Sequence, residues 1–225
     1  MARIQGERNY SLSSNAIVSF LDGTSVFMRF PSGIPALFLV VFGSLVCLQA
    51  HAFDTISLEN EPSIIGLGQK LRVYEDVAGA MKAEDVVNNP VIQWEHLLDD
   101  VPNFGFSHSS FWFGVNVVNP LDHEVKYLFA ATYPLLDRID YYRFEDGSLV
   151  EKIKAGDNIE FAERPIKHRY FLYPLTIQPG QKVTILFNMK TNGSAQLPLE
   201  LVPAQQFVEK DQFELAVQIL FIGIM

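Results

Sequence analysis

The sequence contains a single cysteine, Cys47, among 225 residues. One chain can therefore form no internal disulfide and no cysteine-based zinc site. Basic residues are also scarce, because 17 lysines and arginines are opposed by 26 acidic residues, for a formal net charge of −9. A surface that binds nucleic acid needs clustered lysine and arginine, so nucleic acid is excluded as a partner. With 48% hydrophobic and 12% aromatic residues, the chain can bury a core, which excludes a disordered protein.

The first 52 residues have the pattern of a secretory signal peptide with a long n-region. Residues 34–49 form an apolar run without a charge, Arg29 precedes the run, and Ala50 and Ala52 follow it. Small residues at these two positions predict cleavage before Phe53. The alternative is an uncleaved signal anchor, although the run is short for a membrane span of about 20 residues.

A second apolar segment ends the sequence. Residues 213–225 are apolar apart from Glu214 and Gln218. Thirteen helical residues rise about 20 Å, short of the roughly 30 Å hydrocarbon core. We expect residues 212–225 to be the start of a transmembrane helix, truncated here. The alternative is an amphipathic helix that lies on the preceding domain.

Between these ends, the hydrophobic pattern has a period of two, which is typical of strands. In 182–189 the apolar residues fall on one face, and in 137–143 Ile139 and Tyr141 share a face. The run 111–118 is apolar on both faces, as in a central strand. Further strands are expected at 71–74, 125–132, 149–153, 167–175 and 197–202, and one short helix is expected at 81–87. Turn signals such as Asp146-Gly147 and Pro179-Gly180 separate them. The pattern predicts that residues 53–211 form one all-β, antiparallel sandwich or jelly roll.

Eight short segments in order carry a resemblance to a known family. They are 71–76, 83–86, 104–106 with 111–113, 133–137, 155–157, 164–165, 168–174 and 197–198. Together they resemble the extracellular sensor domain, second type, of bacterial seven-transmembrane receptors with diverse intracellular signalling modules. The resemblance covers about residues 65–209.

The resemblance implies a jelly-roll fold like that of carbohydrate-binding modules and a location in the periplasm, attached to the bacterial inner membrane. In that family, seven membrane helices and an output domain follow the sensor. The chain itself is then a signal-transduction receptor domain and not an enzyme, while a full-length protein would carry an output such as a diguanylate cyclase or a histidine kinase. Such receptors often act as homodimers.

A carbohydrate or small-carboxylate ligand needs aromatic faces for stacking and polar groups for its hydroxyls or charge. The candidate ligand-binding residues are Arg164, His168, Arg169, Asp137, Arg138, Tyr133 and Trp112.

Three of these candidates have a structural alternative. Trp112 lies in an apolar strand and would be a core residue. Arg164 or Arg169 would form an ion pair with an acid such as Asp137 or Asp157. If 167–175 is one strand, His168 and Arg169 point to opposite sides.

Other functions find less support in the sequence. No cofactor is expected, and the histidines after residue 53 lack paired spacing, so no metal site is predicted. A hydrolase would need a facing pair of carboxylates, which the sequence does not single out. The alternative function is a membrane-anchored periplasmic module that binds a partner protein through an exposed patch.

Overall fold

The computed structural model describes residues 53–224, except for the side chains of residues 214, 218, 221, 223 and 224. The predicted signal peptide, residues 1–52, lies outside the described residues. The strands are β1 (Thr55–Ser57), β2 (Ile65–Gly66), β3 (Arg72–Asp76), β4 (Glu95–His96), β5 (Asn103–Phe106), β6 (Ser110–Val118), β7 (Val125–Ala131), β8 (Arg138–Glu145), β9 (Ser148–Ala155), β10 (Phe171–Ile177), β11 (Lys182–Lys190), β12 (Ser194–Gln196) and β13 (Leu199–Pro203). The helical elements are η1 (Gly68–Lys70), α2 (Ala83–Val87), η2 (Phe161–Glu163) and α3 (Ala204–Ile224).

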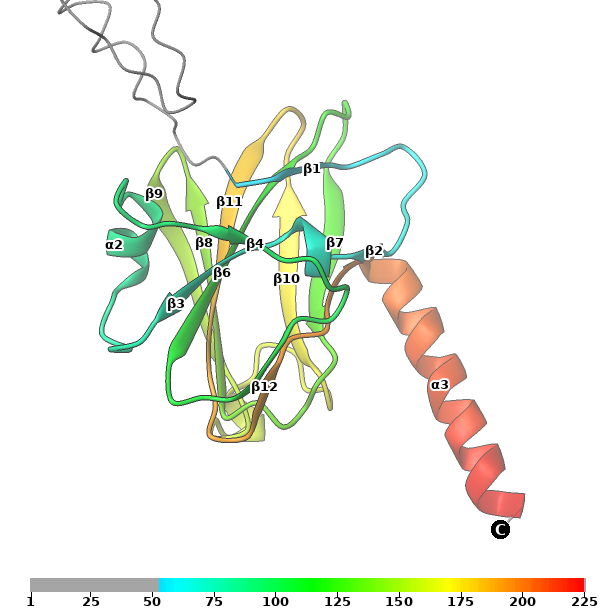
Figure 1. Ribbon diagram of the computed structural model, residues 1–225. Coiled ribbons are helices and arrows are strands. Elements are labelled where there is room, and N and C mark those ends of the chain that lie inside the picture. The colour runs from blue at the N-terminus through cyan, green and yellow to red at the C-terminus, as the bar shows by residue number, and fades with distance from the viewer. Residues whose placement is uncertain (1–52, 225) are drawn as a thin grey trace, which may run out of the picture. The chain divides into compact units, whose positions relative to one another are not determined.

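Two sheets face each other (Figure 1). The larger sheet has seven strands in the order β4-β3-β6-β11-β8-β9, with β1 added to β6. The smaller sheet has the order β10-β7-β13-β2, and β12 pairs separately with β5. Among the described strands only the β1–β6 pair is parallel, so the predicted antiparallel β-sandwich is confirmed.

Aromatic residues join the two sheets in the core. Tyr141 of β8 stacks on Tyr173 of β10 with ring centroids 5.3 Å apart. The Tyr173 hydroxyl donates a hydrogen bond of 2.7 Å to the Ile139 carbonyl on the opposite sheet. Phe129 of β7 meets Phe187 of β11 edge to face at 5.3 Å. The inward faces predicted from the period of two for β8 and β11 are therefore confirmed.

The outer face of the larger sheet is covered by the chain between β3 and β4, which includes α2. Trp112 of β6 and Tyr142 of β8 pack there in one cluster with Val86 and Ile92. This cover explains why β6 is buried on both of its faces, as its apolar sequence predicts. The short helix expected at 81–87 is confirmed as α2.

Two tight turns need backbone conformations that favour glycine. Asp146 and Gly147 connect β8 to β9 with φ angles of 47° and 77°, as expected for a two-residue hairpin turn with Asp-Gly. Gly156 has a φ of 142°, and a Cβ there would lie 2.2 Å from the Asp137 carbonyl oxygen. The backbone at residue 156 therefore packs directly on the start of β8.

One predicted strand begins later than expected. The pattern predicts a strand at 167–175, but β10 begins only at Phe171. Arg164 donates to the His168 carbonyl at 3.1 Å, and the Tyr170 amide donates to His168 Nδ1 at 3.0 Å. These local bonds fold residues 164–170 into a loop, so strand alternation does not set the directions of His168 and Arg169.

Helix α3 follows β13 without a break and begins at Ala204, inside the segment expected to precede the terminal helix. Its first turns pack on the outer face of the smaller sheet, where Phe207 contacts a cluster with Leu128, Leu172 and Val202. Further along, Phe213 and Ile222 are 72% exposed. No helix in residues 53–224 is both long enough and apolar enough to cross a bilayer. The start of a membrane helix stays a prediction.

Candidate functional site

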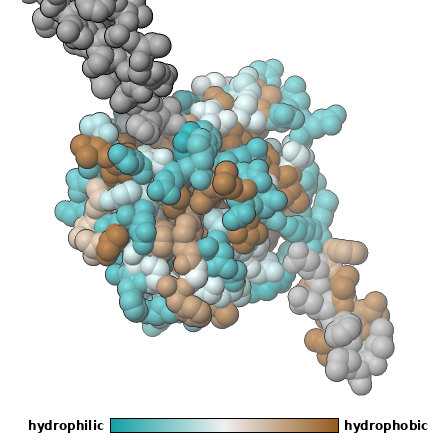
Figure 2. Space-filling view, in the orientation of Figure 1, coloured by the Kyte–Doolittle hydropathy of each residue, from teal (hydrophilic) through white to brown (hydrophobic). Residues whose placement is uncertain are grey.

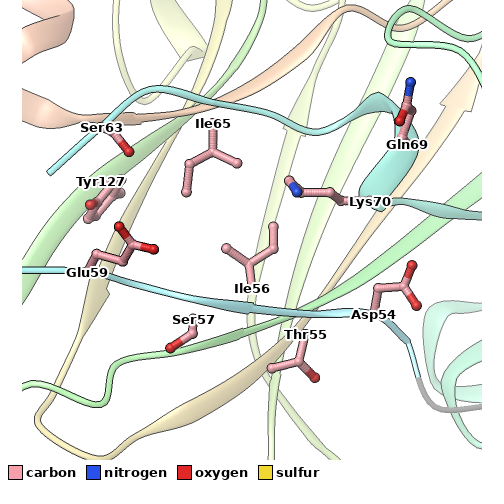
Figure 3. A pocket seen from close by; sticks show the side chains of 10 residues that line it. All are labelled: Asp54, Thr55, Ile56, Ser57, Glu59, Ser63, Ile65, Gln69, Lys70 and Tyr127. Carbon is pink, nitrogen blue, oxygen red and sulfur yellow. The ribbon is translucent and has the colours of Figure 1, made fainter.

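A groove lies between the edges of the two sheets, where β1 and β2 run past each other (Figure 3). Its volume is about 540 Å³. The lining is mostly polar and consists of Asp54, Thr55, Ile56, Ser57, Glu59, Ser63, Ile65, Gln69, Lys70 and Tyr127. Most small-molecule sites are lined mainly by apolar side chains, whereas the several polar groups of this groove suit a small polar molecule that they can orient.

The groove exists because the edge strands are short and pair on one side only. β1 has three residues and pairs with the second half of β6, Asn116–Val118. β3 occupies the first half of the same edge of β6, from Ser110 to Gly114. On the other sheet, β2 has two residues and pairs with β13. The outward edges of β1 and β2 therefore border an opening that no further strand of the described chain fills.

The charged groups in the groove differ in their partners. Asp54 forms an ion pair with Arg72 at 3.2 Å, and His96 Nδ1 lies 3.5 Å from the same carboxylate. Lys70 and Glu59 form no ion pair within residues 53–224. Their side chains extend into the groove from opposite sides (Figure 3). One cation and one anion in the groove are thus open to a ligand.

The floor of the groove is apolar and partly buried. Ile56 is buried and Ile65 is half-buried against the core. Tyr127 is buried next to them, and burial together with the Glu59 carboxylate raises the pKa of Tyr127. The phenol therefore stays protonated at neutral pH and can act as a hydrogen-bond donor.

The groove is connected directly to helix α3. Ser63 and Ile65 line the groove, and the Pro62 carbonyl between β1 and β2 accepts a hydrogen bond of 2.6 Å from Gln206 Nε2 on α3. β2 also pairs with β13, whose last residue precedes α3. Lys210 of α3 bonds Glu200 of β13 at 2.7 Å. A displacement of the wall formed by residues 59–66 would therefore act on the start of α3.

The residues predicted to bind a ligand do not converge on this groove. His168 and Arg169 both contact Asp211 of α3, at 3.0 Å and 2.8 Å. Since His168 Nδ1 accepts the Tyr170 amide, its ring hydrogen is on Nε2 and points to Asp211. Arg169 therefore forms an ion pair, as the structural alternative expected. Its partner Asp211, 42 positions away, was not singled out from the sequence.

Arg164 and Asp137 hold loops at one end of the sandwich. Arg164 donates to the carbonyls of His168 and Gly156, and its guanidinium lies 4.8 Å from the centre of the Phe171 ring. Asp137 accepts hydrogen bonds of 2.7 Å and 3.1 Å from the backbone and side-chain nitrogens of Asn192. These contacts order the loops that precede β8 and β10.

The remaining candidates lie on the larger sheet or in the core. Arg138 pairs with Asp140, which is fully buried and also accepts the Tyr142 hydroxyl at 3.2 Å. Burial and the Asp140 carboxylate raise the pKa of Tyr142. Trp112 is only 2% exposed and cannot offer a ring face to a sugar, so its core alternative is the one the structure supports. Tyr133 packs partly buried against the core.

Within residues 53–224, no group of three histidine, cysteine or acidic side chains lies close enough to hold a metal ion. The groove residues had no distinctive sequence signal. Lys70 stands in a segment that does not match a phosphate-binding loop, and Glu59 is one of many acids. The groove residues come together only because β1 and β2 pair with strands that are far away in the sequence.

The fold is a β-sandwich module with a groove at one open edge and a helix attached to it. The family model described as 7TMR-DISM extracellular 2 matches residues 68–203, more than half of the sequence, and the chain belongs to this family. The resemblance seen in the sequence is thereby confirmed, and the family is one of extracellular sensor domains of membrane receptors. No curated protein matches the chain. The matched region includes Lys70 and Tyr127, whereas the wall from Asp54 to Ile65 precedes it.

Proposed function

We propose that the chain is the periplasmic ligand-sensing domain of a receptor in the bacterial inner membrane. The ligand, a carbohydrate or a small carboxylate, binds in the groove between β1 and β2. Binding changes the position of α3, which leads towards the membrane. One observation carries this proposal: the groove wall is hydrogen-bonded to α3 through Pro62 and Gln206, at 2.6 Å.

The transmission step follows from the contacts of the wall. A ligand that touches Ser63 or Ile65 favours the arrangement of residues 59–66 that fits it best. The same segment pairs with β13 and bonds α3, so two arrangements of the wall would hold the helix differently. A ligand shifts this balance only by its difference in affinity between the two arrangements.

The ends of the chain complete the proposal. Residues 1–52 act as a signal peptide for export, and the apolar part of α3 continues into the first membrane helix. A full-length receptor carries a cytoplasmic output such as a diguanylate cyclase or a histidine kinase and works as a homodimer. The chain passes repeatedly between the two sheets from β6 to β13, which supports kinship with jelly-roll carbohydrate-binding modules.

A protein-docking role has less support from the surface. Val91, Leu98 and Phe106 are each more than 80% exposed. On the face seen in Figure 2, however, hydrophobic residues lie among hydrophilic ones. Docking surfaces for proteins are usually contiguous apolar patches, so the groove is the better candidate.

The proposal is tested by thermal unfolding of the 225-residue chain in detergent with a panel of sugars and small carboxylates at millimolar concentration. At a hundred times its Kd, a ligand stabilises the folded state by about 2.7 kcal/mol. For a domain of this size, that raises the midpoint by roughly 5–10 °C.

Two substitutions locate the effect. Ser63→Trp fills the groove from an exposed wall position, and Ser148→Trp adds the same bulk at an exposed position on β9. We expect the midpoint shift to vanish with Ser63→Trp and to persist with Ser148→Trp. A panel without any shift, or equal shifts in both variants, would contradict a ligand site in the groove.

A further inference from the structure

The groove presents one positive and one negative group without an internal partner. Asp54, the other charged residue of the lining, is held by Arg72 and His96. Lys70 and Glu59 reach into the same space without forming an ion pair within the described chain. The charges available to a ligand therefore sum to zero but are separated in space.

This distribution discriminates between ligand classes. A simple carboxylate would be attracted by Lys70 but repelled by Glu59. A simple amine would be attracted by Glu59 but repelled by Lys70. A sugar usually stacks on an exposed aromatic face, but the lining contains only Tyr127, which is 4% exposed. A molecule with both an ammonium and a carboxylate satisfies both charged groups at once.

The remaining surface suits the rest of such a molecule. Ile65, which is only partly buried, offers an apolar surface to a side chain, and the buried Ile56 lies beneath the groove. The outward edges of β1 and β2 have no strand partner within the described chain. Their amide and carbonyl groups can pair with a peptide backbone, as edge strands do with added strands.

We propose that the ligand of the groove is a small zwitterion, an amino acid or a short peptide, with its carboxylate on Lys70 and its ammonium on Glu59. This inference rests on the proposed function and narrows its ligand to those small carboxylates that also carry an ammonium group. The side chain of the ligand lies over Ile65. Amino acids and short peptides both carry an ammonium and a carboxylate, but only a peptide has a backbone that pairs with the free edges of β1 and β2.

The test is isothermal titration of the detergent-solubilised chain with L-alanine, L-leucine, di-alanine and tri-alanine. Propionate and L-alaninamide serve as probes that lack one of the two charges, and glucose serves as a neutral probe. The variants are Lys70→Met and Glu59→Gln. Matched controls are Lys154→Met on β9 and Glu75→Gln on β3, which change exposed charges outside the groove and its wall.

We expect the zwitterions to bind at least tenfold more tightly than propionate and L-alaninamide. Each groove variant should weaken zwitterion binding at least tenfold, while the two controls leave it unchanged. Glu59→Gln should improve the binding of propionate, because it removes the repulsion. Tighter binding of tri-alanine than of L-alanine would assign the site to peptides, and the reverse order to free amino acids.

Two results overturn the inference in distinguishable ways. If glucose or propionate binds most tightly and Ser63→Trp abolishes that binding, the groove is a ligand site but the zwitterion assignment is wrong. If no probe binds, or if zwitterion binding is the same in Lys70→Met, Glu59→Gln and Ser63→Trp as in the unaltered chain, the proposed function of the groove fails as well.

Discussion

Replacement of Asp211 by alanine should release the first turns of α3 from the sandwich. The carboxylate accepts hydrogen bonds from His168 and Arg169, at 3.0 Å and 2.8 Å. Hydrogen bonds to charged groups contribute about 1.5–3 kcal/mol each. Because Asp211 and Arg169 are partly exposed, at 23% and 34%, solvent screening reduces this contribution. About 2 kcal/mol remains for the pair of contacts, equivalent to a roughly 30-fold larger opening constant for the docked helix.

Amide hydrogen exchange measures this opening, because local exchange follows local unfolding. Amides of 204–213 should exchange roughly 30-fold faster in Asp211→Ala, while those of β11 in the core keep their protection. Glu209→Ala is the matched control, since Glu209 is an exposed acid on the same helix with no ion pair in residues 53–224. Equal exchange of α3 in the unaltered chain, Asp211→Ala and Glu209→Ala would refute the role of Asp211 in holding the helix.

Three further predictions concern the stability of the sandwich. Gly156→Ala should lower the free energy of unfolding by about 2–4 kcal/mol in denaturant melts, because it combines an unfavourable φ with an overlap with the Asp137 carbonyl. Gly147 has open space around it, so Gly147→Ala should lower the free energy of unfolding by only about 1–2 kcal/mol. Equal losses of stability in the two variants would contradict the overlap. Arg138→Met should cost about 2 kcal/mol or more, since it leaves the buried Asp140 carboxylate without its cation, and an unchanged melt would show that the pair is not stabilising. Burial raises the pKa of three core tyrosines, so above pH 10 the unfolded state loses these protons while the folded state keeps them. The free energy of unfolding should therefore fall by up to about 1.4 kcal/mol per pH unit for each tyrosine. A phenolate absorbance that rises before the protein unfolds would contradict this prediction. These residues are Tyr141, Tyr142 and Tyr173.

The sequence predicts those parts of the fold in which a pattern is long enough to recognise. β6, β7, β8 and β11 have seven to nine residues each, and their alternation or continuous hydrophobicity reflects burial on one or both faces. The Asp146-Gly147 turn was predictable because few residues accept two positive φ angles. Strands of two or three residues, such as β1 and β2, have no detectable period.

The candidate site was largely beyond sequence reasoning. Long-range pairing creates the groove, and none of the residues that line it was among the predicted ligand-binding residues. Conversely, the basic segment around His168 and Arg169 stood out as a ligand site, but its partner is Asp211, 43 positions beyond His168. An acid so distant in an acidic chain has no local signal. The predicted alternation within 167–175 also failed, because side-chain bonds from Arg164 and His168 stabilise a loop there.

The most direct test of the account is hydrogen exchange of α3 with and without the compound that most raises the unfolding midpoint. We expect the compound to protect residues 54–70 in the groove walls and, together with that, to change the exchange rate at 204–211 at least about threefold. In Ser63→Trp both changes should disappear. Protection confined to 54–70, with α3 exchanging at the same rate in both states, would show that the groove binds a ligand without acting on the helix, and would contradict the sensing mechanism.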